Sequence, residues 1–125
     1  MLLDSNIIIY AAEPKYDSVR HFIEQQCPAV SVISKIEVLG YNKLTPENQQ
    51  KLEKLFLILP ILSVSDAIVE KAVYLRQQRK MSLGDAIIGA TALIHTLKLA
   101  TANVKDFEWI ENLEVINPVE NQAVF

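Results

Sequence analysis

The chain has 125 residues, of which 12 are basic and 15 acidic, for a formal net charge of −3. This length fits one domain, and the single cysteine, Cys27, excludes an internal disulfide framework and a zinc site built from several cysteines. The longest apolar run, residues 55–62, contains Pro60 and is far shorter than the roughly 18 residues needed to span a membrane. We expect a soluble, cytoplasmic protein with no signal peptide, and the acidic balance disfavours a broad basic nucleic-acid surface.

The first half of the chain alternates short apolar runs with helical patterns. Residues 1–3 are predicted to form a strand and residues 5–12 a helix. A further helix over 16–26 places Val19, Phe22 and Ile23 on one face. The elements predicted next are a strand at 29–32, a helix at 34–44, a helix at 47–57 and a strand at 61–64.

The second half begins with an amphipathic helix over 66–80, whose predicted buried stripe is Ile68, Ala72, Val73 and Leu75. Residues 83–97 carry one charged side chain, Asp85, in an otherwise almost wholly apolar segment that includes His95. Such a segment is typical of a helix enclosed by the rest of the domain, so we expect His95 to be packed in the core. The last predicted strands are 99–101 and 113–116.

Strands that are apolar throughout and that alternate with helices indicate a parallel sheet covered on both faces. The predicted fold is therefore an α/β protein, a three-layer α/β/α sandwich around a central parallel sheet. We expect one domain over residues 1–118 and a carboxy-terminal tail over 119–125.

Polar side chains gather at the predicted carboxyl ends of the strands, where such sheets bind their ligands. Several carboxylates at one edge repel each other unless a cation lies among them, and ligation by oxygen alone favours magnesium or manganese. The residues expected at this edge are Asp4, Glu37, Asp85, Asn103 and Asp106.

Each acid also has a structural explanation. Asp4 is placed to cap a helix that begins at Ser5. The segments 34–37 and 82–85 both fit a capping box, in which a serine and an acid three residues later satisfy each other's backbone amides. Position favours the functional reading most for Asp85, because an uncompensated charge is costly in an apolar helix. The compact basic cluster of Arg76, Arg79 and Lys80 is explained either by a solvated helix end or by phosphate contact.

Four segments of the chain resemble the sequence motifs of PIN domains, and they occur in the family's order. The first is Leu3–Ile9, in which Asp, Ser and Asn follow a strand, and the second is centred on Glu37 within 31–38. The third, 83–93, is an Asp followed by a small-residue apolar helix, and the fourth is 99–107. The compact size is similar to the VapC-type toxins of type II toxin–antitoxin pairs.

The resemblance implies a magnesium-dependent endoribonuclease, a hydrolase of RNA phosphodiester bonds in which Mn²⁺ can substitute for Mg²⁺. Carried over to this chain, the acidic centre is Asp4, Glu37 and Asp85, with Ser5 and Asn6 orienting the first carboxylate. The implied partners are the RNA substrate, a small cognate antitoxin and a second copy of the chain in a homodimer. By analogy, the antitoxin groove is expected beside residues 7–10 and Phe22.

The fourth acidic position of the family falls on Asn103, a neutral ligand, which leaves open one metal ion or two. Asp106 either contributes through water or caps the turn before Phe107. Asn103 also keeps open a non-catalytic RNA-binding PIN-like module. A receiver-type phosphoacceptor domain and an aspartyl phosphatase are weaker alternatives, because Asp4 is followed by Ser5-Asn6 where those proteins require further acids.

The net charge is unevenly distributed along the chain. Residues 105–125 contain one base and five acids, which leaves eleven bases and ten acids in residues 1–104. Three of those ten acids are the expected metal ligands. RNA binding is therefore expected to depend on the metal and on a local face of the protein, not on bulk charge.

Overall fold

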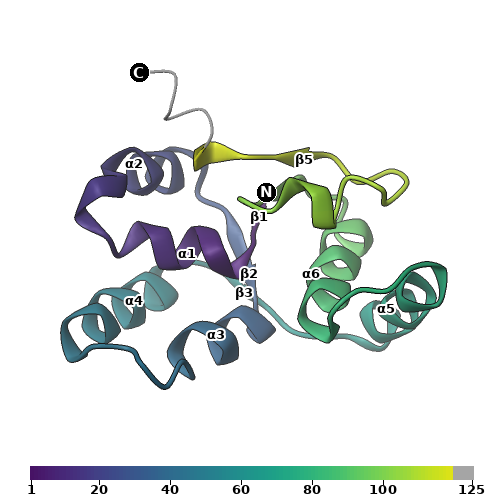
Figure 1. The fold of residues 1–125 in the computed structure, drawn as a ribbon, viewed down its shortest axis with the longest axis horizontal. Coiled ribbons are helices and arrows are strands. Elements are labelled where there is room, and N and C mark those ends of the chain that lie inside the picture. Colours follow the sequence, from purple (N-terminus) through teal and green to yellow (C-terminus); the bar gives the residue numbers. More distant parts are fainter. Residues whose placement is uncertain (120–125) are drawn as a thin grey trace.

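The computed structural model describes residues 1–119 and shows a parallel sheet with helices on both of its faces (Figure 1). Within these residues the strand order is β3-β2-β1-β4-β5, and every neighbouring pair is parallel. This confirms the predicted three-layer α/β sandwich and places β1 at the centre of the sheet. The strands are β1 Leu2–Leu3, β2 Ala29–Ser31, β3 Ile61–Leu62, β4 Leu99–Ala100 and β5 Val115–Ile116.

Helices α1 to α4 lie on one side of the sheet, and α5 and α6 lie on the other (Figure 1). Two short 3₁₀ turns, η1 and η2, complete the described elements. The bounds are α1 Ser5–Ala11, η1 Pro14–Tyr16, α2 Asp17–Gln26, α3 Val32–Leu39, α4 Pro46–Ile58, α5 Asp66–Gln78, α6 Leu83–Ile94 and η2 Val104–Asp106.

Each short central strand contributes to two hydrophobic cores, because successive side chains of a strand point to opposite faces of the sheet. Leu3, Val30 and Ala100 belong to the core on the side of α1 to α4. Leu2 and Leu99 belong to the core on the side of α5 and α6. All five side chains are fully buried, so β1 and β4 join the two cores.

The start of α3 differs from the prediction. Residue 34 was expected to cap this helix, but α3 begins at Val32, and the residue with the extended backbone of a cap is Ser31, whose Oγ accepts from the Ile33 amide at 3.2 Å. Ser34 is instead a buried residue of the first turn. The predicted capping box at 34–37 is therefore wrong, because the strand ends at Ser31 and the helix begins directly after it, three residues before the expected cap.

The end of α6 is also earlier than predicted. The helix ends at Ile94 and His95 is its exposed C-cap, so the expectation of a packed histidine is wrong. Thr96 follows in a left-handed conformation, with φ of 52°, and turns the chain toward β4. On α5, Val73 was expected in the buried stripe but is 50% exposed, whereas Ile68, Ala72 and Leu75 are buried as predicted.

Topology bears on one of the alternative functions. A receiver-type sheet has the order 2-1-3-4-5, which differs from the order found here, so that alternative is wrong.

Of the predicted tail 119–125, Val119 packs against the core beside α1 to α4, and residues 120–125 lie outside the described residues. No helix within residues 1–119 is long and apolar enough to cross a membrane.

Candidate functional site

The strand order reverses between β1 and β4, and a reversal of this kind opens a crevice at the carboxyl ends of the two strands. Asp4 follows β1 and Thr101 follows β4. Glu37 reaches the same edge from α3, and Asp85 reaches it from the first turn of α6. The charges of Glu37 and Asp85 both act on the Asp4 carboxylate, so the three predicted acids share one edge of the sheet.

The Asp4 side chain is buried and held from two sides. The Ser5 amide donates to Oδ1 at 2.8 Å, and the Thr101 hydroxyl donates to Oδ2 at 2.7 Å. Burial raises the pKa of Asp4 from 3.8 to about 6, and the nearby carboxylates of Asp85 and Glu37 add to the rise, although the two hydrogen bonds oppose it. Asp4 also caps α1, so its structural and its proposed functional roles coexist.

Thr101 is the centre of a network that sequence reasoning missed. Its Oγ1 accepts from the backbone amide of Asn103 at 3.0 Å and from Asn6 Nδ2 at 3.5 Å. Because these donors occupy the lone pairs of the hydroxyl, its own proton points to Asp4. Asn6 Oδ1 also accepts from the Ala102 amide at 3.3 Å. Asn6 therefore orients Asp4 through Thr101 and the loop after β4.

The Glu37 side chain is exposed to solvent, but residues of two neighbouring elements position its carboxylate. Ser5 Oγ donates to Glu37 Oε1 at 2.7 Å and lies 2.9 Å from the hydroxyl of Ser34. On the other side, a Cβ atom at Gly84 would lie 2.6 Å from Glu37 Oε2. The carboxylate thus rests against the first turn of α6, in space that only glycine leaves open.

Asp85 is half-buried, and its pKa is raised by burial and then by the nearby carboxylate of Asp106, with a smaller contribution from Glu37. The Ser82 side chain opposes the rise and also caps α6, because Ser82 Oγ accepts from the Asp85 amide at 3.1 Å. The predicted cap at 82–85 is therefore present. The neighbouring carboxylates that help to raise the pKa values of Asp4 and Asp85 show that negative charge is concentrated at this edge.

The two remaining candidates are placed differently. Asn103 has an exposed side chain and contributes its backbone amide to Thr101. Asp106 acts on Asp85 through its charge and ends η2, but within the described residues its side chain caps no turn.

The donor set at the acidic edge consists of oxygen atoms, which suit a hard cation. Carboxylate oxygens without nitrogen or sulfur ligands suit Mg²⁺, which is commonly held by one or two carboxylates together with water and substrate phosphates. Within residues 1–119, no three His, Cys, Asp or Glu side chains are close enough to hold an ion together. The chemistry of the edge therefore fits a divalent cation with few direct protein ligands, and Asp4 and Asp85 are the residues that would hold it.

Two residues that position the acids, Thr101 and Gly84, were not predicted. Each contacts an acid that is distant in sequence. Thr101 was assigned to the strand, although a hydroxyl directly after a strand at the ligand edge is a recognisable pattern. Gly84 looked like an ordinary small residue of an apolar helix, and its role appears only when α3 and α6 are brought together.

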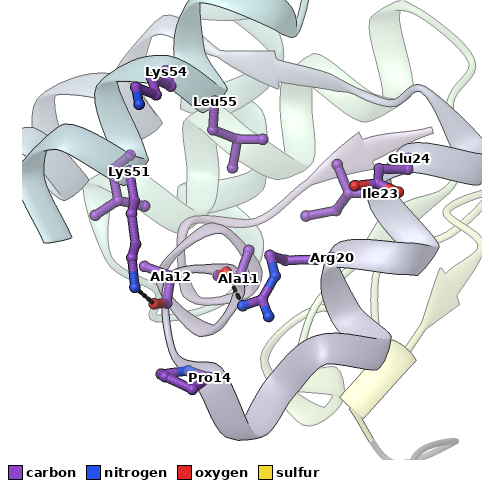
Figure 2. Close-up of a pocket in the computed structure, with 10 residues that line it drawn as sticks. Ala11, Ala12, Pro14, Arg20, Ile23, Glu24, Lys51, Lys54 and Leu55 are labelled. Atoms are coloured by element: carbon purple, nitrogen blue, oxygen red, sulfur yellow. Dashed lines mark hydrogen bonds between the residues drawn. The ribbon is translucent and has the colours of Figure 1, made fainter.

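A second hollow lies away from the acids, between the end of α1 and the helices α2 and α4 (Figure 2). Its volume is about 430 Å³, and its apolar lining includes Ile23 and Leu55. Arg20 donates to Ala11 O at 3.0 Å, and Lys51 donates to Ala12 O at 3.5 Å. Residues 7–8, expected in the groove by analogy, are fully buried and do not line it.

The family model for the PIN domain matches residues 1–112. The chain belongs to the PIN domain family. Ribonuclease VapC1 of Rickettsia felis is 31% identical to it over 132 aligned residues, which cover 93% of this chain and 94% of that protein. Ribonuclease VapC10 of Mycobacterium tuberculosis is 30% identical over 91 residues, or 69% of this chain. The predicted resemblance to PIN domains of the VapC type is confirmed.

Two solved structures contain chains that share the fold over more than nine-tenths of this chain. A toxin–antitoxin complex from Klebsiella pneumoniae contains a chain that is 35% identical, with a TM-score of 0.76, covering 94% of this chain and 96% of that one. VapBC2 from Rickettsia felis, solved bound to a DNA fragment of its promoter, contains a chain that is 26% identical with a TM-score of 0.82, covering 93% and 96%. The described PIN fold of this chain is therefore nearly coextensive with theirs.

Proposed function

We propose that this chain is an endoribonuclease that hydrolyses RNA phosphodiester bonds with the help of Mg²⁺ and acts as the toxin of a toxin–antitoxin pair. The observation that carries the proposal is the buried Asp4, whose pKa is raised beside Asp85 and Glu37 at the switch point of a PIN fold. The similarity to ribonucleases named VapC supports the substrate class. We propose a cytoplasmic site of action, where RNA is available.

A bound divalent cation supplies positive charge that offsets the charge developing on the phosphodiester during hydrolysis. Asp4 and Asp85 would hold that cation at the switch point, and Thr101 keeps the Asp4 carboxylate in place. Glu37, oriented by Ser5, accepts a proton from the attacking water while the oxygen of that water bonds to phosphorus. The bond from phosphorus to the leaving oxygen breaks, and that oxygen takes up a proton from solvent.

The test compares two acids from the first turns of helices. Asp85→Asn is expected to lower RNA cleavage by the purified protein more than about 100-fold, since even residues that only support metal ligands commonly contribute 10- to 100-fold. Asp66→Asn, in the first turn of α5 and exposed, is the matched control and should cleave normally. EDTA should abolish cleavage, and Mg²⁺ or Mn²⁺ should restore it.

Full cleavage by Asp85→Asn would contradict the assignment of the site. Cleavage in EDTA would contradict the role of a divalent cation. If the unaltered protein binds RNA but does not cleave it with either metal, the alternative of a non-catalytic RNA-binding PIN module is favoured, and Asn103 is the residue that supports that alternative.

We also propose a small antitoxin as the partner, because the similar solved structures are toxin–antitoxin complexes. The hollow between α1, α2 and α4 suits an apolar segment of such a partner, and its rim carries the cations Lys51 and Lys54 (Figure 2). Leu55→Asp should abolish co-purification with the product of the neighbouring gene but leave RNA cleavage unchanged. Normal co-purification of this variant would exclude the hollow as the docking site.

A homodimer is proposed from exposed apolar side chains as well as from the family. Val69 and Val73 lie one turn apart on α5 and are 46% and 50% exposed. Leu57 and Ile58 at the end of α4 are 86% and 77% exposed. Sedimentation of the purified chain should give the mass of two copies, and Val73→Glu should reduce it to one if α5 lies in the interface.

A further inference from the structure

A cleft of about 540 Å³ lies beside the acidic edge, on the side of α5, α6 and η2. Asp85 and Asp106 line it together with the cations Arg76, Arg79, Lys80 and Lys105. This is a local concentration of positive charge in a chain whose net charge is −3. The ion pairs found in residues 1–119, such as Lys51–Glu47 and Lys98–Glu114, do not involve these four cations.

One wall of the cleft is a cation–π pair formed by Arg79 and Trp109. The Arg79 guanidinium carbon lies 5.5 Å from the centre of the Trp109 ring. The indole is fixed by packing against the core beside α5 and α6, and by Nε1, which donates to Asp106 O at 3.0 Å. The ring attracts the guanidinium group, and guanidinium planes stack on unpaired bases of RNA.

The remaining cations are placed to meet phosphates. Arg76 Nε donates to Met81 O at 3.3 Å, which positions the side chain and leaves its terminal nitrogens available. Lys80 follows the end of α5, and Lys105 belongs to η2, so cations enter the cleft from two segments. A basic end of α5 is also explained by the negative end of its helix dipole, but Lys105 is not on that helix.

We infer that this cleft binds one nucleotide of single-stranded RNA next to the cleaved bond, with the phosphate on Arg76, Lys80 and Lys105 and the base on the Arg79–Trp109 stack. The inference rests on the proposed function, because Asp85 lies both in the cleft and at the proposed catalytic edge. An unpaired base is required, since a base within a duplex does not expose its face to a side chain.

Trp109 is the single tryptophan of the sequence, so its fluorescence reports on this cleft alone. A short single-stranded RNA, titrated in Mg²⁺ onto the Glu37→Gln variant to prevent cleavage, should quench that fluorescence, whereas polyphosphate, which has no bases, should not. Arg79→Gln should weaken RNA binding roughly tenfold, as expected for the loss of one stacked base. A single-stranded DNA of the same sequence shows whether the ribose is recognised.

The phosphate contacts are tested through salt. For single strands, each phosphate contact contributes about 0.7 to the slope of log binding constant against log salt concentration. The double variant Arg76→Gln/Lys80→Gln should therefore lower the magnitude of the slope by about 0.7, because the cleft binds one phosphate. The matched control is Lys43→Gln/Lys98→Gln, which removes the same charge from residues outside the cleft and should leave the slope unchanged.

The outcomes separate the two proposals. RNA cleavage in Mg²⁺ with no quenching of Trp109, and with the same salt slope for both double variants, overturns the cleft and leaves the ribonuclease standing. Quenching and a reduced slope without any cleavage support the cleft and overturn the ribonuclease. Neither binding nor cleavage of RNA overturns both.

Discussion

Asp4 and Asp85 lie at the same edge of the sheet, but the protein holds them in opposite ways. Asp4 is 5% exposed and receives hydrogen bonds from the start of α1 and the loop after β4. Asp85 is half-buried at the start of α6 and borders an open basic cleft. A fixed carboxylate defines where a cation would be held, and an accessible one can meet a substrate phosphate. The site therefore has a fixed half, at Asp4, which must be rigid, and an accessible half, at Asp85, which must stay open to substrate.

The largest expected difference concerns the cost of burying the Asp4 charge. In the unfolded chain this carboxyl loses its proton near pH 3.8, and in the folded, metal-free protein near pH 6. Between these values the folded state binds more protons, so the free energy of unfolding falls as pH rises, by roughly 3 kcal/mol in total. Asp4→Asn resembles the protonated acid and removes this penalty.

The measurement is urea unfolding of the metal-free proteins at pH 4 and pH 7.5. Relative to the unaltered protein, Asp4→Asn should gain about 2–3 kcal/mol between the two pH values. Asp85→Asn should gain less, because Asp85 is more exposed. Adding Mg²⁺ at pH 7.5 should stabilise the unaltered protein but not Asp4→Asn. A stability difference that does not change with pH would show that Asp4 titrates normally.

The next effect isolates the fixed half of the site. Thr101→Val removes the hydroxyl that donates to Asp4 Oδ2 and should lower the free energy of unfolding by about 1–3 kcal/mol at pH 7.5. Cleavage should fall 10- to 100-fold, because Asp4 loses its orientation. Thr91→Val is the control, since Thr91 is equally buried but its hydroxyl donates within α6 to Ile87 O. Equal losses of activity in the two variants would exclude a specific role for Thr101.

The smallest expected effect concerns the contact between Gly84, in the first turn of α6, and Glu37 on α3. In Gly84→Ala the new methyl group would meet Glu37 Oε2, the end of a flexible side chain, so stability should change by less than about 1 kcal/mol. Cleavage should fall several-fold as Glu37 is displaced. In a Glu37→Ala background, Gly84→Ala should have no further effect on cleavage. A further loss there would mean that residue 84 acts on something other than Glu37.

The acidic edge was largely predictable from sequence, because Asp4 follows a strand, Glu37 lies in the helix after the next strand and Asp85 is the one charge of an apolar helix. The way in which they are held was not. Thr101 lies 97 residues from Asp4 in sequence, and the contact of Gly84 with Glu37 depends on how two helices pack. Local patterns also compete, as at Ser31 and Ser34, where two serines three residues apart both suit a cap and only the backbone decides.

The basic cleft is a second feature that could be predicted only in part from the sequence. Arg76, Arg79 and Lys80 were visible as a basic cluster, but sequence alone left open whether they face solvent or a ligand. Lys105 and Trp109, which complete the cleft, lie more than twenty residues further along the chain. Their convergence follows from the packing of η2 beside α5 and α6.

The position of β1 at the centre of the sheet also affects when the protein becomes active during synthesis. Leu2 and Leu3 leave the ribosome early, but they pair with Leu99 and Ala100, and Asp4 depends on Thr101. A nascent chain that lacks residues 99–101 has neither the second neighbour of its central strand nor the hydroxyl that fixes its first carboxylate. Such a chain holds Asp4 in no defined position until most of the domain has been translated. For a proposed toxin, this topology delays activity until residues 99–101 have been synthesised and have folded.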